Sequence, residues 1–172
     1  MNIKKNKIAG KSLQAKMLQL RQQRLKGFQD FTDVPHRMEK VRVHNDVIFI
    51  NDAKAENTNA TYFAMQSIRK PIIWLVGGDD VQTDYWDLMS LVRQKVDAII
   101  MIGEHNDKIN FTFSPVITEM YEAETMEEAV KLAYQLSKPK STILLSPAAK
   151  ADNLYADYED RGDQFIKAVK KI

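Results

Sequence analysis

Apolar residues along this chain follow two alternating patterns. Short uninterrupted apolar runs, such as the one at residues 72–76 that stops at Gly77, are typical of buried strands. Longer segments between them repeat apolar residues every three to four positions, as amphipathic helices do. We expect strands at residues 41–43, 47–50, 72–76, 98–102, 116–120 and 142–145. We expect helices at residues 57–68, 85–94, 126–136 and 153–171, with a short one near residue 107.

The order of these elements predicts the fold class. The first two strands join through His44-Asn45-Asp46, a cluster of turn formers, which predicts a hairpin. After the hairpin, strands alternate with helices, several of them 10 to 15 residues long, which is typical of a mostly parallel sheet with helices on both faces. Thr125 and Glu128 have the spacing of a capping box at the start of the helix at 126–136. The pattern therefore predicts an α/β domain.

The first part of the chain has a different character. Apolar residues within residues 12–30 recur at spacings of three to five, which predicts an amphipathic helix, and Pro35 interrupts the pattern. Residues 1–29 contain eight lysines and arginines and no acid, although the net charge of the whole chain is only +2. We therefore divide the chain into a basic helical segment, residues 1–32, and a domain, residues 33–172. The charge fits a solvated helix that packs on its own domain, a phosphate-bearing partner or, as the lowest-ranked alternative, nucleic acid.

Composition removes several function classes. The 172 residues include no cysteine, which excludes disulfide frameworks, thiolate metal sites and thiol nucleophiles. No apolar run approaches the roughly 18 residues of a membrane-spanning helix, and the Lys-rich start lacks the apolar core of a secretory signal. The expected location is the cytoplasm, with no membrane partner.

The loops after the strands are the places to search for a site. In parallel sheets, ligands bind outside the carboxyl ends of the strands. The corresponding loops here are residues 51–57, 77–84, 103–107 and 146–157.

The loop at 51–57 contains the most informative chemistry, because Asp52, Lys54 and Asn57 lie between a strand and a helix. Lys54 and the free amides of the helix start can bind a carboxylate or a phosphate. The alternative is that Asp52 and Asn57 only cap the helix while Lys54 is solvated. The three histidines lack metal-ligand spacing, and no serine lies in a nucleophile elbow, so we assign neither metal ligands nor catalytic residues.

Five motifs occur in one order along the chain, and together they carry a family resemblance. They are Pro35-His36-Arg37-Met38-Glu39, Phe49-Ile50-Asn51-Asp52-Ala53-Lys54-Ala55, Gly77-Gly78, Leu144-Leu145-Ser146-Pro147-Ala148 and Tyr158-Glu159-Asp160-Arg161-Gly162. From about residue 33 to its end, the chain resembles the C-terminal domain of the Mur ligase family, in particular its UDP-N-acetylmuramoylalanine:D-glutamate ligases.

The resemblance implies a Rossmann-like C-terminal domain of a three-domain enzyme of peptidoglycan synthesis. Such enzymes use ATP and magnesium to make an acyl phosphate, which the amine of D-glutamate attacks. It implies that Arg37 and Asp52 face the nucleotide, that Lys54 and Tyr158 face the phosphate or the amino acid, and that Asn57 supports the loop. The phosphate cradle and the UDP-sugar site belong to the central and N-terminal domains, which would be this chain's partners. The chain alone would bind no cofactor and would be inactive.

The chain also departs from the family pattern. Ala53 and Glu56 stand where the family has a serine and a threonine, and the sequence after Gly78 lacks the family's lysine. Lys150 and Ala151 replace the end of another family motif, which removes a substrate-contacting hydroxyl. The added acid opposes the binding of D-glutamate. The second hypothesis is therefore a stand-alone, non-catalytic module with regulatory or interaction function.

Overall fold

The computed structural model describes residues 34–104 and 106–172. The basic segment at residues 1–32, with the helix expected within residues 12–30, and the boundary at residue 33 lie outside the described residues, so they stay predictions. Residues 36–172 form one compact unit.

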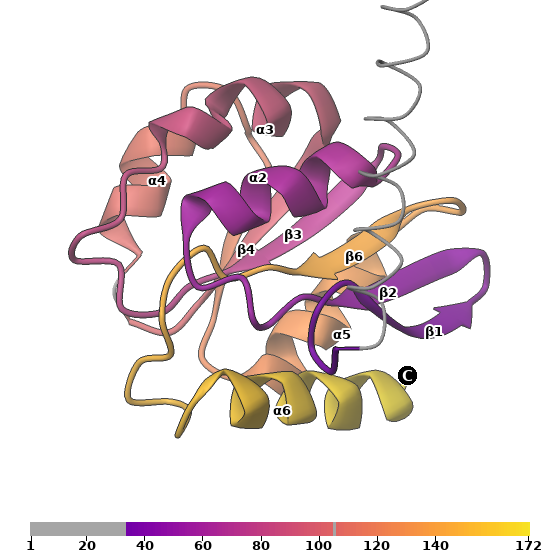
Figure 1. The fold of residues 1–172 in the computed structure, drawn as a ribbon. Coiled ribbons are helices and arrows are strands. Elements are labelled where there is room, and N and C mark those ends of the chain that lie inside the picture. The colour runs from indigo at the N-terminus through magenta and orange to yellow at the C-terminus, as the bar shows by residue number, and fades with distance from the viewer. Residues whose placement is uncertain (1–33, 105) are drawn as a thin grey trace, which may run out of the picture. The chain divides into compact units, whose positions relative to one another are not determined.

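A six-stranded sheet forms the centre of this unit, in the order β1-β2-β6-β3-β4-β5 (Figure 1). β1 pairs antiparallel with β2, and each of the other neighbouring pairs is parallel. The strands are β1 (Glu39–His44), β2 (Val47–Asn51), β3 (Ile72–Val76), β4 (Val96–Ile102), β5 (Met120–Ala123) and β6 (Thr142–Leu145). The mostly parallel sheet with an N-terminal hairpin is confirmed.

Turn chemistry explains the hairpin. Asn45 and Asp46 both adopt positive φ angles, of 47° and 62°. Asn and Asp tolerate this region better than other residues with side chains, and two such residues in succession suit a tight hairpin turn. The resulting register pairs His44 with Val47, and the other edge of β2 pairs with β6.

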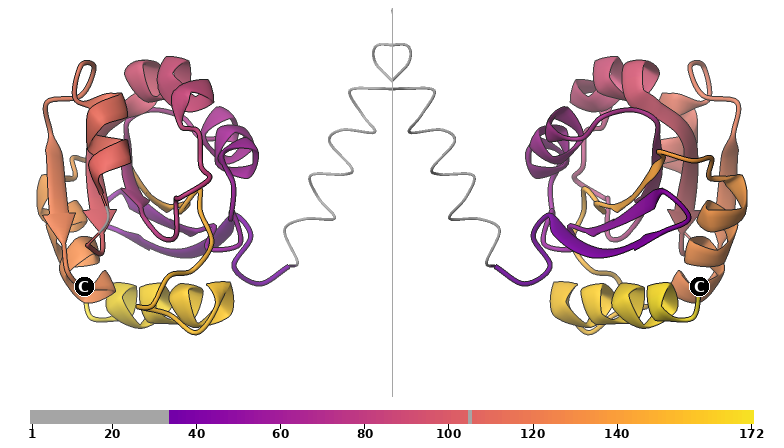
Figure 2. Two further views of the ribbon diagram at one scale, coloured as in Figure 1. Left: turned by 90° about the vertical axis from the view of Figure 1, so that its left-hand side faces the viewer. Right: turned by 90° about the vertical axis from the view of Figure 1, so that its right-hand side faces the viewer.

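Helices cover both faces of the sheet, as the side views show (Figure 2). Alternate residues of β3 point to opposite faces: Ile73 and Leu75 join the core under α5 and α6, whereas Trp74 joins the core under α2, α3 and α4. Burial on both faces explains why β3 is a continuous apolar run. The helices are α2 (Thr58–Ser67), the 3-10 helix η1 (Trp86–Leu88), α3 (Met89–Lys95), α4 (Asp107–Phe113), α5 (Met126–Leu136) and α6 (Tyr158–Lys170).

The start of α5 confirms the predicted cap and adds a detail. The Thr125 side chain accepts a hydrogen bond from the Glu128 amide at 3.2 Å. The Glu128 carboxylate, however, accepts from the Glu124 amide, one residue before the cap. The reciprocal half of the capping box is therefore displaced by one residue.

Two predicted elements are wrong in position. The strand predicted at 116–120 is β5 at Met120–Ala123, because Val116 and Ile117 donate their amides to the Phe113 carbonyl and continue the turn that ends α4. Ile117 is buried there in the core on the α4 face, so its apolar character reflects packing and not strand pairing.

The last helix begins later than predicted. α6 starts at Tyr158 rather than near residue 153, because the Asp157 carboxylate caps it by accepting from the amides of Glu159 and Asp160. Residues 153–156 consequently belong to the loop after β6.

Candidate functional site

The carboxyl ends of β2, β6, β3 and β4 lie along one edge of the sheet, since these four neighbours run parallel. The loops that follow them therefore gather at that edge, as the sequence predicts. They contain the predicted residues Asp52, Lys54 and Asn57, and α6 brings Tyr158 to the same place.

Asp52 lies immediately after β2 and is only 2% exposed. One carboxylate oxygen accepts from the Met38 amide at 3.2 Å, and the other accepts from the Ser146 hydroxyl at 3.0 Å. The Ser146 hydroxyl also lies 2.9 Å from the Thr61 hydroxyl. Asp52 thus joins the β2 loop, the β6 loop and the turn that carries Arg37.

Burial governs the charge of Asp52. Loss of solvent raises its pKa from 3.8 to about 6, while the hydrogen bonds from Ser146 and Met38 and the charge of Arg37 act in the opposite direction. A buried carboxylate with only partial compensation costs free energy when ionised. The carboxyl group is consequently sensitive to pH in the mildly acidic range.

Arg37 lies in a strained turn. Its neighbours His36 and Met38 have positive φ angles, of 60° and 47°, which are uncommon for residues with side chains. Four hydrogen bonds hold the turn: those of His36 to Glu39, Asn51 and Lys54, and that of Met38 to Asp52. Strained backbone of this kind persists only where the surroundings enforce it, and it is often associated with function.

Lys54, in the loop after β2, and Tyr158, at the start of α6, are brought together although they lie 104 residues apart in the chain. The Lys54 ammonium donates to the Tyr158 hydroxyl at 3.3 Å and lies 5.0 Å from the centre of its ring. The Tyr158 hydroxyl in turn donates to the Glu159 carboxylate at 3.0 Å. Tyr158 thereby restricts where the half-buried Lys54 cation can lie.

Asn57 caps the start of α2, and capping was one of the two roles predicted for it. Its side-chain oxygen accepts from the Ala60 amide at 2.9 Å, at the start of α2. The side chain is exposed and belongs to the lining of a cavity. The contact supports the reading of Asn57 as a structural residue of the loop.

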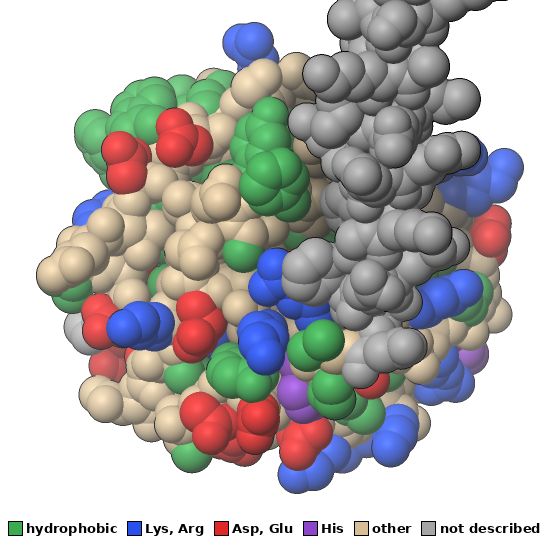
Figure 3. All heavy atoms as spheres, viewed as in Figure 1, with side chains coloured by type: hydrophobic (Ala, Val, Ile, Leu, Met, Phe, Trp, Pro, Cys, Tyr) green, Lys and Arg blue, Asp and Glu red, His purple; other side chains and the backbone are tan. Residues whose placement is uncertain are grey.

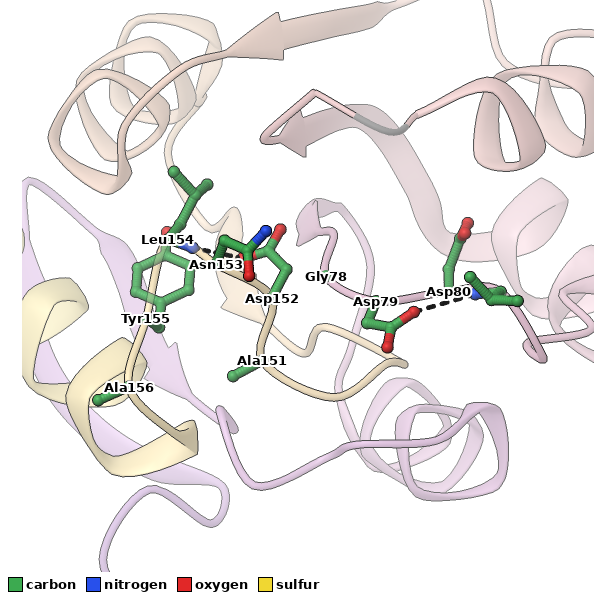
Figure 4. Close-up of a pocket in the computed structure, with 10 residues that line it drawn as sticks. Gly78, Asp79, Asp80, Ala151, Asp152, Asn153, Leu154, Tyr155 and Ala156 are labelled. Atoms are coloured by element: carbon green, nitrogen blue, oxygen red, sulfur yellow. Dashed lines mark hydrogen bonds between the residues drawn. The ribbon is translucent and has the colours of Figure 1, made fainter.

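Two cavities open between the loops. The first, of about 760 Å³, lies between residues 78–81 and residues 151–156. Figure 4 shows Asp79 and Asp80 on the loop after β3, and Asp152 and Asn153 on the loop after β6. Among the residues that the structure describes, three carboxylates and no lysine or arginine line this cavity.

The second cavity, of about 670 Å³, adjoins the first, since Asp79 and Val81 line both. The Asp79 amide donates to the Lys150 carbonyl at 3.0 Å, which joins the β3 loop to the β6 loop beside both cavities. The charged lining of the second cavity consists of Glu56, Asp79, Asp84 and Lys150. Acidic and basic side chains are also interspersed on the face of the molecule in Figure 3.

The departures from the family pattern lie at these cavities. Glu56 and Gln82 line the second, Ala151 lines the first, and Val81 lines both. Ala53, in contrast, is fully buried and lines neither. The substitutions therefore make the cavities more acidic and leave the cluster around Asp52 and Lys54 intact.

Sequence reasoning missed the partners of the predicted residues. Ser146 occurs in one of the five family motifs without an assigned role, yet its hydroxyl binds Asp52. Its position directly after a buried strand was the available signal, because that is where the loops gather. Within the described residues, no group of three or more His, Cys, Asp or Glu side chains has the arrangement of a metal site.

Comparison with known proteins gives a family. The family model described as Mur ligase, glutamate ligase domain, matches residues 36–149. Among named relatives, the UDP-N-acetylmuramoylalanine--D-glutamate ligase of Christiangramia forsetii is 42% identical over 169 residues. That match covers 98% of this chain, so it takes in most of the basic segment, and 38% of the relative. The ligase of the same name from Porphyromonas gingivalis is 41% identical over 96% of the chain and 36% of its own length.

Solved structures show the same fold at low sequence identity. MurF ligase from Thermotoga maritima in complex with ADP has a TM-score of 0.52 and 16% identity, over 81% of this chain and 32% of that one. UDP-N-acetylmuramate-alanine ligase MurC from the same organism has a TM-score of 0.54 and 14% identity, over 83% and 31%. A single domain of a putative Mur-type ligase from Haemophilus ducreyi matches over 99% of its length, with a TM-score of 0.53 and 14% identity.

Proposed function

Because the chain belongs to the Mur ligase family, we propose that it acts as the C-terminal domain of an ATP-dependent ligase that adds D-glutamate to UDP-N-acetylmuramoyl-L-alanine. The chain spans about two fifths of the length of the relatives it matches, so the N-terminal and central domains of such a ligase are its proposed partners. The reaction belongs to peptidoglycan synthesis and to the cytoplasm. No helix of the described residues is long and apolar enough to cross a membrane.

The cluster of Arg37, Asp52 and Lys54 carries this proposal. A strained turn holds Arg37, a buried carboxylate anchors that turn, and Tyr158 restrains the Lys54 cation. Two cations held at the carboxyl edge of a parallel sheet suit the binding of phosphate and carboxylate oxygens. In a ligase that forms an acyl phosphate, such groups orient reactants and offset developing negative charge.

ATP and magnesium belong to the proposed complete enzyme. Arg37 is the residue of this chain that we assign to the nucleotide, with Asp52 fixing its position, and Lys54 is assigned to the phosphate or the amino-acid carboxylate. When bound, the nucleotide would supply the phosphoryl group that activates the substrate carboxylate. The described residues would bind and orient, and none is assigned a proton transfer.

Calorimetric titration of the chain tests the proposal. D-glutamate, ATP with magnesium and UDP-N-acetylmuramoyl-L-alanine are titrated separately into the wild type and into Lys54→Met, with Lys131→Met on the exposed face of α5 as control. We expect D-glutamate to bind and Lys54→Met to weaken binding about tenfold, as for a lost charged hydrogen bond. Equal heats from all three proteins would contradict the assigned role of Lys54.

The acidic lining of the cavities favours a second candidate, a non-catalytic module. In the described part of the two linings, five acids, Glu56, Asp79, Asp80, Asp84 and Asp152, outnumber the one lysine, Lys150, and D-glutamate itself carries a net negative charge. Glu56→Gln removes one of these charges and should tighten D-glutamate binding if the ligase function is retained, whereas Glu122→Gln on β5 should not. A module without ligase function would bind D-glutamate in neither variant.

A further inference from the structure

Arg161, in the first turn of α6, is among the largest fully buried side chains of the domain, with 1% exposure. Its neighbours on the same turn, Glu159 and Asp160, are much more accessible. Burial of a guanidinium removes it from water, and this desolvation lowers the pKa of Arg161, while the charge of Glu56 acts in the opposite direction. Such a costly placement requires a reason in the surrounding structure.

The two hydrogen bonds of Arg161 point to that reason. Its Nη2 atom donates to the Ala53 carbonyl at 3.0 Å and to the Ala149 carbonyl at 3.2 Å. Each of these carbonyls belongs to the peptide group that precedes a lysine, Lys54 in the β2 loop and Lys150 in the β6 loop. One buried cation therefore fixes the backbone that carries two other cations, Lys54 beside Tyr158 and Lys150 at the second cavity.

A third loop meets the same guanidinium. Gly78, after β3, has a φ of 140°, and a Cβ atom there would lie 3.2 Å from the Arg161 Nη1 atom and 2.2 Å from the Lys150 carbonyl oxygen. The backbone of the β3 loop thus passes directly against the guanidinium. Arg161 contacts all three loops whose residues line the two cavities.

The first turn of α6 also holds the side-chain end of Lys54. Tyr158 precedes Arg161 by three residues, a spacing that places both on one side of a helix. Tyr158 contacts the Lys54 ammonium, while Arg161 binds the carbonyl before its backbone nitrogen. A single helical turn therefore restrains both the side chain and the backbone of Lys54.

Stability alone does not account for Arg161. Its Nε and Nη1 groups are buried without a hydrogen-bond acceptor in the part of the chain that the structure describes. Buried donors without acceptors cost free energy, and apolar residues often replace buried charges without loss of stability. The benefit of Arg161 therefore lies in the geometry that it imposes on the loops.

We propose that Arg161 is a positioning residue that clamps the β2, β3 and β6 loops and thereby sets the place of Lys54 beside Tyr158 and that of Lys150 at the second cavity. The clamp itself follows from the contacts of Arg161, and its importance for ligation rests on the proposed function. A lysine cannot reproduce the whole clamp, because it lacks the rest of the planar guanidinium, whose Nη1 atom lies against Gly78 in the β3 loop while Nη2 bonds the two carbonyls.

Hydrogen exchange of the full chain tests the clamp without any ligand, so its outcome is independent of the ligase assignment. Arg161→Lys and Arg161→Met are compared with Lys170→Met, which removes an exposed charge near the end of the same helix. We expect the amides of Asp79 and Ala148, which bond across the loops, to exchange at least about tenfold faster in both Arg161 variants. The amides of β3 and β4 should change little.

A spectroscopic signal of Lys54 separates positioning from general loosening. In the reductively ¹³C-methylated chain, the Tyr158 ring 5.0 Å away should shift the Lys54 methyl resonance. We expect that shift to be lost in both Arg161 variants and kept in Lys170→Met. Unchanged Lys54 resonances together with unchanged loop exchange would overturn the proposal.

If both Arg161 variants fail to fold, a measurement on the wild-type chain tests whether Arg161 is held between the loops. The guanidinium protons of Arg161 should exchange with water far more slowly than those of the exposed Arg93. Equal exchange rates at the two arginines would show that Arg161 is not held between the loops, and this result would also overturn the proposed clamp.

Discussion

Lys54 and Tyr158 are joined twice, by a hydrogen bond of 3.3 Å and by the position of the ammonium 5.0 Å from the ring centre. The two residues come from the loop after β2 and from the start of α6. This pairing links the only lysine of the β2 loop to the helix that also carries Arg161.

The pairing predicts a graded response to substitution of Tyr158. Tyr158→Phe removes the hydroxyl but keeps the ring, so D-glutamate affinity should fall only about threefold, whereas Tyr158→Ala should lower it about tenfold. Calorimetry of the two variants measures the difference. Equal losses in both would show that the ring contributes nothing to the placement of Lys54.

Asp52 predicts a pH dependence of stability with a definite sign. Its folded pKa, about 6, lies above the unfolded value of 3.8, so the folded state binds the proton more tightly. The contribution to stability is thus complete below about pH 4 and is lost as the pH rises through 6, amounting to about 3 kcal/mol. Urea unfolding at pH 4, 5, 6 and 7 gives the free energy of unfolding of the wild type and of Asp52→Asn. The wild-type value minus the Asp52→Asn value should fall as the pH rises. A difference that rises with pH would mean that the hydrogen bonds and Arg37 outweigh the cost of burial.

The close packing at Gly78 predicts that a single added methyl group lowers the free energy of unfolding strongly. Gly78→Ala would place Cβ 2.2 Å from the Lys150 carbonyl oxygen in a backbone conformation with φ of 140°, so we expect a loss of about 2 kcal/mol or more. Gly103→Ala is the control, because φ is also positive there but the nearest atoms are side-chain atoms at 3.2 Å. Thermal unfolding should show a clearly larger effect at Gly78. Similar losses would indicate that backbone strain, and not contact between the loops, sets the cost.

The position of Asp157 as the N-cap of α6 predicts that its side chain contributes to the stability of the domain. Asp157→Ala removes the acceptor for the Glu159 and Asp160 amides and should cost about 1 kcal/mol, while Asp157→Asn should keep most of the stability. Because the cap precedes Tyr158, the alanine variant should also reduce the ring-current shift of Lys54. An unchanged Lys54 resonance would show that the cap does not influence where the Lys54 side chain lies.

Most of the fold was predictable from local patterns. The bounds of β3, α5 and β6 agree with the apolar runs and the Thr125 cap, because burial on two faces or on one stripe leaves a direct trace in the sequence. The strand at β5 and the start of α6 were misplaced, because Ile117 is apolar for packing and the cap at Asp157 decides where the helix begins.

The site was only partly predictable. Family motifs indicated Asp52 and Lys54, but the hydroxyl of Ser146 and the guanidinium of Arg161 became visible as partners only after the loops were brought together. These contacts span 94 and 108 residues, and no local pattern encodes such distances. The acidic character of the cavities likewise depends on which loops face each other.

Ligase activity of a chimera gives the decisive measurement. The C-terminal part of the Christiangramia forsetii ligase that this chain matches is replaced by the chain, and D-glutamate-dependent release of ADP is followed in the presence of UDP-N-acetylmuramoyl-L-alanine and magnesium. We predict D-glutamate-dependent turnover that Lys54→Met lowers at least about a hundredfold and Lys131→Met leaves unchanged. A folded chimera without D-glutamate-dependent turnover would contradict the ligase function and leave the non-catalytic module in its place.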